Sequence, residues 1–122
     1  MTHILVIDDD ISIQLLFGQY LKDKGYSVAL ASDGKEGLRQ MHERKPDLII
    51  TDIMMPEMDG LEIIQELRKN NPALPVIAIS GGIRNNTINF LPIAKKTGAY
   101  RVLEKPIELA RLLETVQELT QQ

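Results

Sequence analysis

The sequence contains no cysteine among its 122 residues. Disulfide bonds and thiolate metal sites are therefore excluded, and the composition is compatible with a reducing compartment. No apolar stretch approaches the roughly 18 residues that cross a bilayer, and the first residues lack the charged and apolar regions of a secretory signal. We therefore expect a cytoplasmic protein that neither spans a membrane nor is anchored to one.

A cluster of basic residues is also missing. Lysine and arginine number 14 against 17 aspartate and glutamate, which gives a formal net charge of -3, and the basic residues are dispersed. This distribution argues against direct binding of nucleic acid. No linker, low-complexity stretch or internal repeat divides the chain. Because a chain of this length buries about two-thirds of its unfolded surface, we expect residues 1–122 to form a single domain.

The chain instead shows strand-like and helix-like segments in alternation. Short apolar strands, rich in Val, Ile and Leu and without polar alternation, are predicted over 3–7, 26–31, 47–52, 76–79 and 100–104. Helices are predicted over about 11–24, 34–44, 60–70 and 86–97. A final helix carries an apolar stripe at Leu109, Leu112, Leu113, Val116 and Leu119. Strands of this composition are typical of a parallel sheet that is covered on both faces.

Several helix ends carry local signals. Gly25 stands where a left-handed residue usually ends a helix. Asp33, followed three residues later by Glu36, is an aspartate version of the capping box. Pro92 predicts a kink or a first turn within the segment 86–97, so this helix is expected to be irregular.

Strict alternation of strands and helices predicts a doubly wound α/β fold, in which helices cover both faces of a parallel sheet. In the strand order 2-1-3-4-5, the first and third strands lie side by side at the switch point, where open sheets bind ligands. Asp8 and Asp9 follow the first strand, and Asp52 ends the third. This order therefore predicts that the three carboxylates lie together.

The chemistry of such a cluster can be argued from its charge. Two carboxylates about 4 Å apart repel by roughly 4 kcal/mol at an effective dielectric near 20, so the cluster needs a cation or protons. Oxygen ligands without His or Cys favour Mg2+ or Mn2+, and an ion that keeps water ligands recruits phosphate oxygens. Asp52 would then attack phosphorus, while Lys105 and the Ser80 hydroxyl contact the phosphoryl oxygens.

Each residue also has a plainer interpretation when it is taken alone. The run 8–10 could simply cap the helix that begins at Ile11, and Asp10 is expected to do so. Asp52 could start a loop, and Ser80 could belong to a turn with the two glycines that follow it. Lys105 could be solvated. His3 and His42 are expected at the surface and not as ligands.

Taken together, four segments resemble the receiver domain of two-component response regulators. They are Leu5-Val6-Ile7-Asp8-Asp9-Asp10, the segment from Asp52 to Gly60, Ser80-Gly81 and Lys105-Pro106. The match is ordered and covers essentially the whole chain. It implies a flavodoxin-like (βα)5 three-layer sandwich of the chemotaxis-Y-like, single-domain type.

The resemblance also implies roles for individual residues. Asp52 would accept a phosphoryl group from a histidine kinase or a histidine phosphotransfer protein. Asp8, Asp9, Asp52 and the backbone carbonyl of Met54 would hold Mg2+, with Mn2+ as a substitute. Ser80 would reorient towards the phosphoryl group and Lys105 would pair with it, and the peptide bond before Pro106 would be cis.

The implied protein is a signalling switch that catalyses only its own phosphorylation and dephosphorylation. No output module is expected within these residues, so the signal would pass to an unknown protein target from a monomer or a weak, phosphorylation-dependent dimer. The alternative is an interaction scaffold that is not phosphorylated. An aspartyl phosphatase and a flavin carrier are disfavoured, because Met54 replaces the second aspartate of the phosphatase and the loop after the first strand is acidic.

Some positions depart from the usual pattern of the family. Val102 stands where an aromatic switch residue is common, and Ile107 stands where Phe is common. Met54 and Gly82 occupy positions whose side chains influence the attacking water, and neither can orient water by hydrogen bonding. We therefore expect slow loss of the phosphoryl group, over minutes or longer. Gly81 would leave the acceptor open to small donors.

Overall fold

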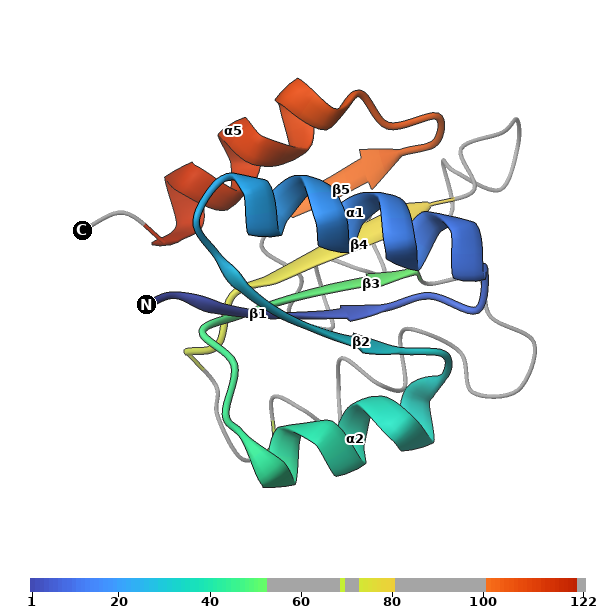
Figure 1. Ribbon diagram of the computed structural model, residues 1–122, viewed down its shortest axis with the longest axis vertical. Coiled ribbons are helices and arrows are strands. Elements are labelled where there is room, and N and C mark those ends of the chain that lie inside the picture. The colour runs from blue at the N-terminus through green and yellow to red at the C-terminus, as the bar shows by residue number, and fades with distance from the viewer. Residues whose placement is uncertain (53–68, 70–72, 81–100, 121–122) are drawn as a thin grey trace.

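A computed structural model of the chain describes residues 1–52, 69, 73–80 and 101–120. In this part, a parallel sheet lies between helices on its two faces (Figure 1). The elements are β1 His3–Ile7, α1 Ile11–Asp23, β2 Ser27–Ala31, α2 Gly34–Glu43, β3 Leu48–Asp52, β4 Val76–Ser80, β5 Arg101–Glu104 and α5 Leu109–Thr120. The helices expected over 60–70 and 86–97 lie outside the described residues, apart from Lys69.

The five strands are all parallel and follow the order β2-β1-β3-β4-β5, which confirms the doubly wound fold that the sequence predicts. Ile7 pairs with Thr51 across the contact between β1 and β3. Asp8 and Asp52 each come directly after one residue of this pair. The register of the sheet therefore brings both carboxylates to the same edge.

β1 and β3 bury side chains on both faces, as their composition predicts, whereas Arg101 and Glu104 of β5 are exposed. On one face, Leu5 and Ile7 of β1 belong to a core that α2 covers with Leu38 and Met41. On the other face, the intervening strand residues join a second core with residues of α1 and α5, namely Ile4, Val6, Phe17, Leu21, Leu112 and Val116. Figure 1 shows α1 and α5 above the sheet and α2 below it. The two cores fix the sheet edge that carries the carboxylates.

Two helix ends follow the local signals closely. Gly25 adopts φ 97°, the left-handed conformation expected after a helix. The Asp33 side chain accepts from the Glu36 backbone N–H at 2.8 Å, which is the expected cap of α2. The Glu36 carboxylate, however, accepts from the backbone N–H of Ser32, one residue before the cap, at 2.6 Å. The capping box therefore also holds the end of the loop after β2 through this hydrogen bond.

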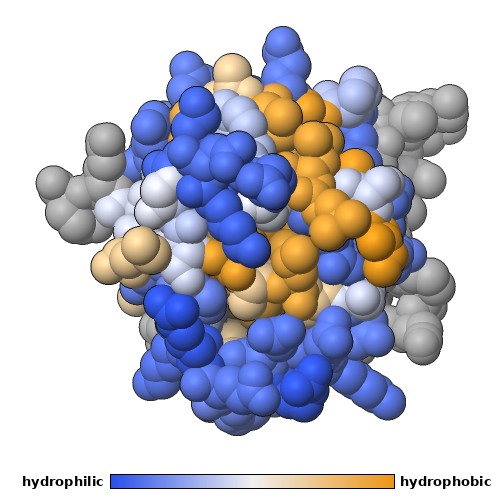
Figure 2. All heavy atoms as spheres, in the orientation of Figure 1, coloured by the Kyte–Doolittle hydropathy of each residue, from blue (hydrophilic) through white to orange (hydrophobic). Residues whose placement is uncertain are grey.

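The outer face of α1 is unusually apolar. Ile11, Leu15 and Leu16 are 58%, 59% and 48% exposed. Figure 2 shows hydrophobic residues gathered on the side of the molecule where α1 lies, whereas the side of α2 is mostly hydrophilic. Among the described residues, none of the helices is both long enough and apolar enough to cross a membrane.

His3 is buried, so its expected place at the surface is wrong. It is only 6% exposed, because it is the first residue of β1, which lies between β2 and β3. Its Nδ1 lies 2.9 Å from the Ser27 hydroxyl, and its backbone N–H donates to the Asp47 carboxylate at 2.8 Å. His42 is exposed, as expected.

Candidate site at the carboxyl edge of the sheet

Three carboxylates converge at the carboxyl ends of β1 and β3. One oxygen from each of Asp8, Asp9 and Asp52 lies within 4.8 Å of the other two. Asp8 is 1% exposed and Asp52 is 4% exposed, while Asp9 faces solvent. The cluster is thus buried on one side and open on the other, and a cation from solution can reach it.

The backbone and one carboxylate oxygen of Asp8 are held in place by neighbours. Its N–H donates to the Ala31 carbonyl at 3.0 Å, and its carbonyl accepts from the Gln14 amide at 2.8 Å. Its Oδ1 accepts the Asp10 backbone N–H at 2.9 Å. These bonds come from β2, α1 and the following loop, so the orientation of Asp8 is fixed before any ligand binds.

The pKa of Asp8 is raised from 3.8 to about 6, and burial is the largest cause. The negative charges of Asp52 and Asp9 also contribute to the rise, whereas the hydrogen bond from the Asp10 N–H and the charge of Lys105 oppose it. The ionised cluster is therefore costly, and a bound cation would relieve that cost. Three oxygen donors without nitrogen or sulfur suit a hard divalent ion such as Mg2+.

Lys105 reaches the cluster from the loop after β5. Its Nζ donates to Asp52 Oδ2 at 3.1 Å and lies 3.7 Å from Asp8 Oδ2. Burial lowers the pKa of Lys105, but the hydrogen bond and charge of Asp52, together with the charges of Asp8 and Asp10, raise it overall. The Lys105 side chain is therefore protonated and positively charged at neutral pH. The peptide bond between Lys105 and Pro106 is cis.

Comparison with known proteins places this arrangement in a family. The model of the response regulator receiver domain matches residues 4–117. The chain belongs to this family. Receiver domains are the signalling switches of two-component systems and work by phosphorylation.

Relatives and solved structures agree with the match. The chain is 35% identical over 120 residues to the transcriptional regulatory protein GlrR of Escherichia coli K12. This alignment covers 98% of this chain and 26% of GlrR. Chemotaxis protein CheY4 of Vibrio cholerae matches with a TM-score of 0.88 at 31% identity, over 98% of both chains. A CheY-like receiver domain of Methanospirillum hungatei matches with a TM-score of 0.88 at 29% identity, over 97% of this chain and 92% of that one. The chain spans about a quarter of the length of the first curated relatives that it matches.

In this receiver domain, the acidic residues 8–10 after β1 have two different structural roles. Asp8 and Asp9 join the carboxylate cluster. Asp10 instead caps α1, and its side chain accepts from the Ser12 N–H at 2.9 Å. The hydroxyl and the N–H of Ser12 lower the pKa of Asp10. The predicted cap is therefore confirmed for Asp10, whereas Asp8 and Asp9 are placed beside Asp52.

Other expected site residues are described in part or not at all. Ser80 is the last residue of β4, as expected, and its backbone pairs with Glu104. The Ser80 side chain, Met54 with its carbonyl, Gly81 and Gly82 lie outside the described residues, as does Pro92. Val102 is half-buried in β5 and packs against the core that α2 covers.

Gln14 is a contact of the site that sequence reasoning missed. It is 6% exposed, and its Nε2 donates to the Asp8 carbonyl and to the Ser32 hydroxyl. A signal was present, because Gln14 shares its helix face with Phe17, Gly18 and Leu21, which are all buried. A polar residue on an apolar face needs a buried partner.

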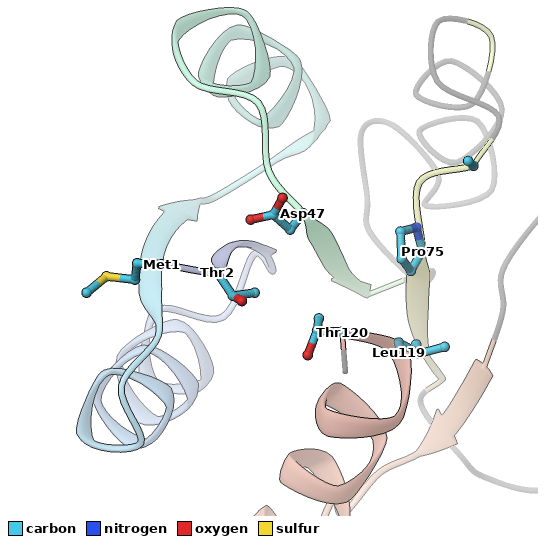
Figure 3. A pocket seen from close by; sticks show the side chains of 7 residues that line it. Met1, Thr2, Asp47, Pro75, Leu119 and Thr120 are labelled. Atoms are coloured by element: carbon cyan, nitrogen blue, oxygen red, sulfur yellow. The ribbon is translucent and has the colours of Figure 1, made fainter. Parts of the chain in front are cut away.

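A hollow at the opposite edge of the sheet takes no part in this receiver site. Figure 3 shows Thr2, Asp47, Pro75 and Leu119 around it. Asp47 precedes β3, whereas Asp52 ends it. The hollow is therefore separated from the carboxylate cluster by the length of the strand, about 16 Å for five residues.

Proposed function

We propose that this receiver domain accepts a phosphoryl group on Asp52 from a phosphohistidine donor, and that the phosphorylated form binds a protein target. The observation that carries the proposal is the set of contacts around Asp52. Its carboxylate lies within 4.8 Å of those of Asp8 and Asp9, and the Lys105 ammonium donates to it at 3.1 Å. Phosphoryl transfer needs a nucleophile, anionic ligands for a metal ion and a positive charge near the phosphoryl group. In the proposal, Asp52 is the nucleophile, Asp8 and Asp9 are the further ligands, and the Lys105 ammonium supplies the positive charge.

The donor set fits Mg2+, with Asp8, Asp9 and Asp52 as the described ligands and the Met54 carbonyl as a further proposed one. When bound, the ion offsets negative charge on the carboxylates and on the phosphoryl oxygens. An oxygen of Asp52 attacks phosphorus, so that an O–P bond forms as the N–P bond of the phosphohistidine breaks. The imidazole leaves with the bonding electron pair and takes up a proton. Lys105 remains beside Asp52 and contacts the charge that has been added.

The switch follows from the charge of the product. Phosphorylation adds up to two negative charges and three acceptor oxygens at the ends of the strands. Lys105 and the Ser80 hydroxyl are the proposed groups that reach them, and the conformation in which both do so is favoured. Because Val102 is not aromatic, this receiver domain is proposed to signal without the usual aromatic movement at that position.

The proposed donor is a histidine kinase or a histidine phosphotransfer protein. Ile11, Leu15 and Leu16 on α1 support docking beside the cluster, because α1 begins directly after the acidic run and exposes these apolar side chains. We propose neither nucleic acid nor a membrane as a direct partner of this domain. Residues 1–122 are proposed to form a single domain in the cytoplasm. The phosphoryl lifetime is proposed to be minutes or longer, because Met54 and Gly82 cannot orient water.

The decisive test is mass spectrometry after incubation with Mg2+ and acetyl phosphate or phosphoramidate. We expect a gain of one phosphoryl mass that depends on Mg2+ and is lost in Asp52→Asn. Asp47→Asn is the matched control, because Asp47 directly precedes the strand that Asp52 ends, and it should be labelled like the wild type. If no mass is gained under conditions that label an ordinary receiver domain, the protein is a scaffold that is not phosphorylated.

A further inference from the structure

The carbonyl oxygen that Gln14 binds belongs to the peptide unit between Asp8 and Asp9. Gln14 Nε2 donates to this oxygen at 2.8 Å. The contact identifies the nitrogen of the amide, because a carbonyl oxygen only accepts. The orientation of this peptide plane sets the directions in which the two neighbouring residues leave it. Gln14 therefore holds the one backbone unit that joins two of the three clustered carboxylates.

The same nitrogen is held from a second side. Its other hydrogen lies towards the Ser32 hydroxyl at 3.1 Å, and the Ser32 N–H donates to the Glu36 carboxylate at 2.6 Å. Glu36 is itself fixed by its place in the cap of α2. Both amide hydrogens of Gln14 are thus used, and the β1–α1 loop is connected to the beginning of α2.

We infer that Gln14 is a positioning residue of the metal site, which orients Asp8 and Asp9 for a divalent cation by fixing the peptide plane between them. This inference rests on the proposed function, in which these carboxylates hold Mg2+. Gln14 does not contact the cation or the phosphoryl group. Groups that orient metal ligands from outside typically change metal affinity by about ten- to a hundred-fold when they are removed.

The test compares two methionine variants of the whole chain. Gln14→Met keeps the length of the side chain but removes both donors. Gln40→Met is the matched control, because Gln40 Nε2 also donates to a backbone carbonyl, that of Leu30, at 2.9 Å, and Leu30 carries no ligand. The affinity for Mn2+ is measured by electron paramagnetic resonance of the free ion, and that for Mg2+ by competition. The melting temperature without metal is recorded beside them.

We expect Gln14→Met to weaken Mn2+ and Mg2+ binding by roughly ten-fold, while Gln40→Met lowers the melting temperature with unchanged affinity. If Gln14→Met lowers only the melting temperature and binds both ions as the wild type does, Gln14 has a purely structural role and the inference is wrong. If the wild type itself binds neither ion, the metal site of the proposed function fails, and the inference fails with it.

A second variant keeps the test decisive if Gln14→Met does not fold. Ser32→Ala removes one of the two bonds of the amide and leaves the other, so the peptide plane is held less firmly. We expect a smaller loss of affinity, roughly two- to three-fold. If Ser32→Ala folds and binds the cations with wild-type affinity while Gln14→Met is unfolded, the inference is rejected.

Discussion

Asp8, Asp9 and Asp10 are chemically the same residue, yet each meets a different environment. Asp8 is buried with a raised pKa, Asp9 is open to solvent, and Asp10 is a helix cap with a lowered pKa. The difference comes from their distance along the chain from the end of β1. The first of them directly follows the buried strand β1, and the third is the N-cap of α1.

The raised pKa of Asp8 has a consequence for stability without metal. A carboxyl group with a folded pKa of about 6 and an ordinary value of 3.8 stabilises the fold fully below pH 3.8, and this contribution is lost as the pH rises through 6. The loss is at most about 3 kcal/mol. Asp8→Asn removes the titrating group and can still accept the Asp10 N–H. We therefore expect this variant to be more stable than the wild type at pH 7.5, by about 1 to 3 kcal/mol.

Urea unfolding in the presence of a chelator measures this difference at pH 4.5 and pH 7.5. The gain should be small at the lower pH and large at the higher one. An excess of Mg2+ should reverse the order at pH 7.5, because only the wild type keeps all three carboxylates. A gain of equal size at both pH values would contradict the assignment of the titration to Asp8.

Lys105 should stabilise the cluster even when no metal is bound. Its ammonium lies 3.1 Å from Asp52 and 3.7 Å from Asp8, and its side chain is 28% exposed. Lys105→Met leaves the carboxylates without this charge, so we expect the free energy of unfolding to fall by about 1 to 3 kcal/mol, less than for a fully buried pair. Lys35→Met, at an exposed lysine of α2, is the control. Equal effects of the two variants in urea at pH 7.5 with chelator would show that the Lys105 contacts contribute nothing.

The sequence locates the charged residues of the site well and the neutral ones poorly. Asp8, Asp52 and Lys105 were predictable, because each lies at the carboxyl end of a predicted strand and the carboxyl ends of parallel strands share one edge. Gln14 and His3 were not, because their roles depend on which neighbour faces one particular side chain. A pattern of hydrophobic residues indicates which face of an element is buried. It does not indicate which carbonyl or hydroxyl group will form a hydrogen bond with a polar side chain on that face.

The helix α2 packs closely against the sheet at Gly37. A Cβ at Gly37 would lie 2.6 Å from Cδ1 and 3.1 Å from Cγ1 of Ile7, the residue before Asp8. Because Ile7 is completely buried, its side chain has little room to move. The absence of a side chain at Gly37 thus lets α2 pack directly against the strand that carries the first carboxylate.

We expect Gly37→Ala to destabilise the protein by about 1 to 2 kcal/mol, since overpacking outweighs the better helix propensity of alanine. Gly18→Ala in α1 is the matched control, because its Cβ would meet only the half-buried Leu30 at 3.2 Å. That variant should be neutral or slightly stabilising. Thermal unfolding of both variants decides between these outcomes.

Ile7→Val offers a further check of the same contact, because it removes the Cδ1 atom that the new methyl group would meet. The double variant with Gly37→Ala should therefore be less destabilised than the sum of the two single variants. Strict additivity would place the effect of Gly37→Ala elsewhere than at Ile7.

At the same scale, the sequence predicted the described elements to within two residues at each end. The strands were recognisable because both faces of β1 and β3 are buried, which removes the alternation of an exposed sheet. Helix ends were recognisable where a cap or a glycine marks them, as at Asp33 and Gly25. The unexpected hydrogen bond from the Ser32 N–H to the Glu36 carboxylate arises because the loop after β2 turns this N–H towards the helix. The motif does not specify this detail of loop geometry.

For the molecule as a whole, the two edges of the sheet hold titratable groups of opposite effect. Asp8 lies after β1, and its ionisation weakens the fold as the pH rises. His3 opens the same strand at the other edge. Burial lowers its pKa from 6.5, the Arg44 charge lowers it further, and the Asp47 carboxylate and the Ser27 contact oppose this. The Asp8 contribution changes between pH 3.8 and about 6, and the His3 contribution changes below pH 6.5, so in the metal-free protein the two effects oppose each other over largely the same pH range.

The sign for His3 follows from its lowered pKa. The neutral imidazole is favoured in the fold, so its contribution is present above pH 6.5 and is lost as the pH falls through the lower folded value. His3→Asn, which can still hydrogen-bond with the Ser27 hydroxyl, should remove the loss of stability that His3 causes as the pH falls. Asp8→Asn should remove the loss that Asp8 causes as the pH rises. Because the two residues lie at opposite ends of β1, the effects should add. Melting temperatures of both single variants and of the double variant are recorded from pH 4.5 to pH 8 with chelator. Below pH 6.5, the slope of the profile should shift in opposite directions in the two single variants, and the double variant should lie between them. A profile for His3→Asn with the same slope as that of the wild type would place the acid sensitivity in other groups.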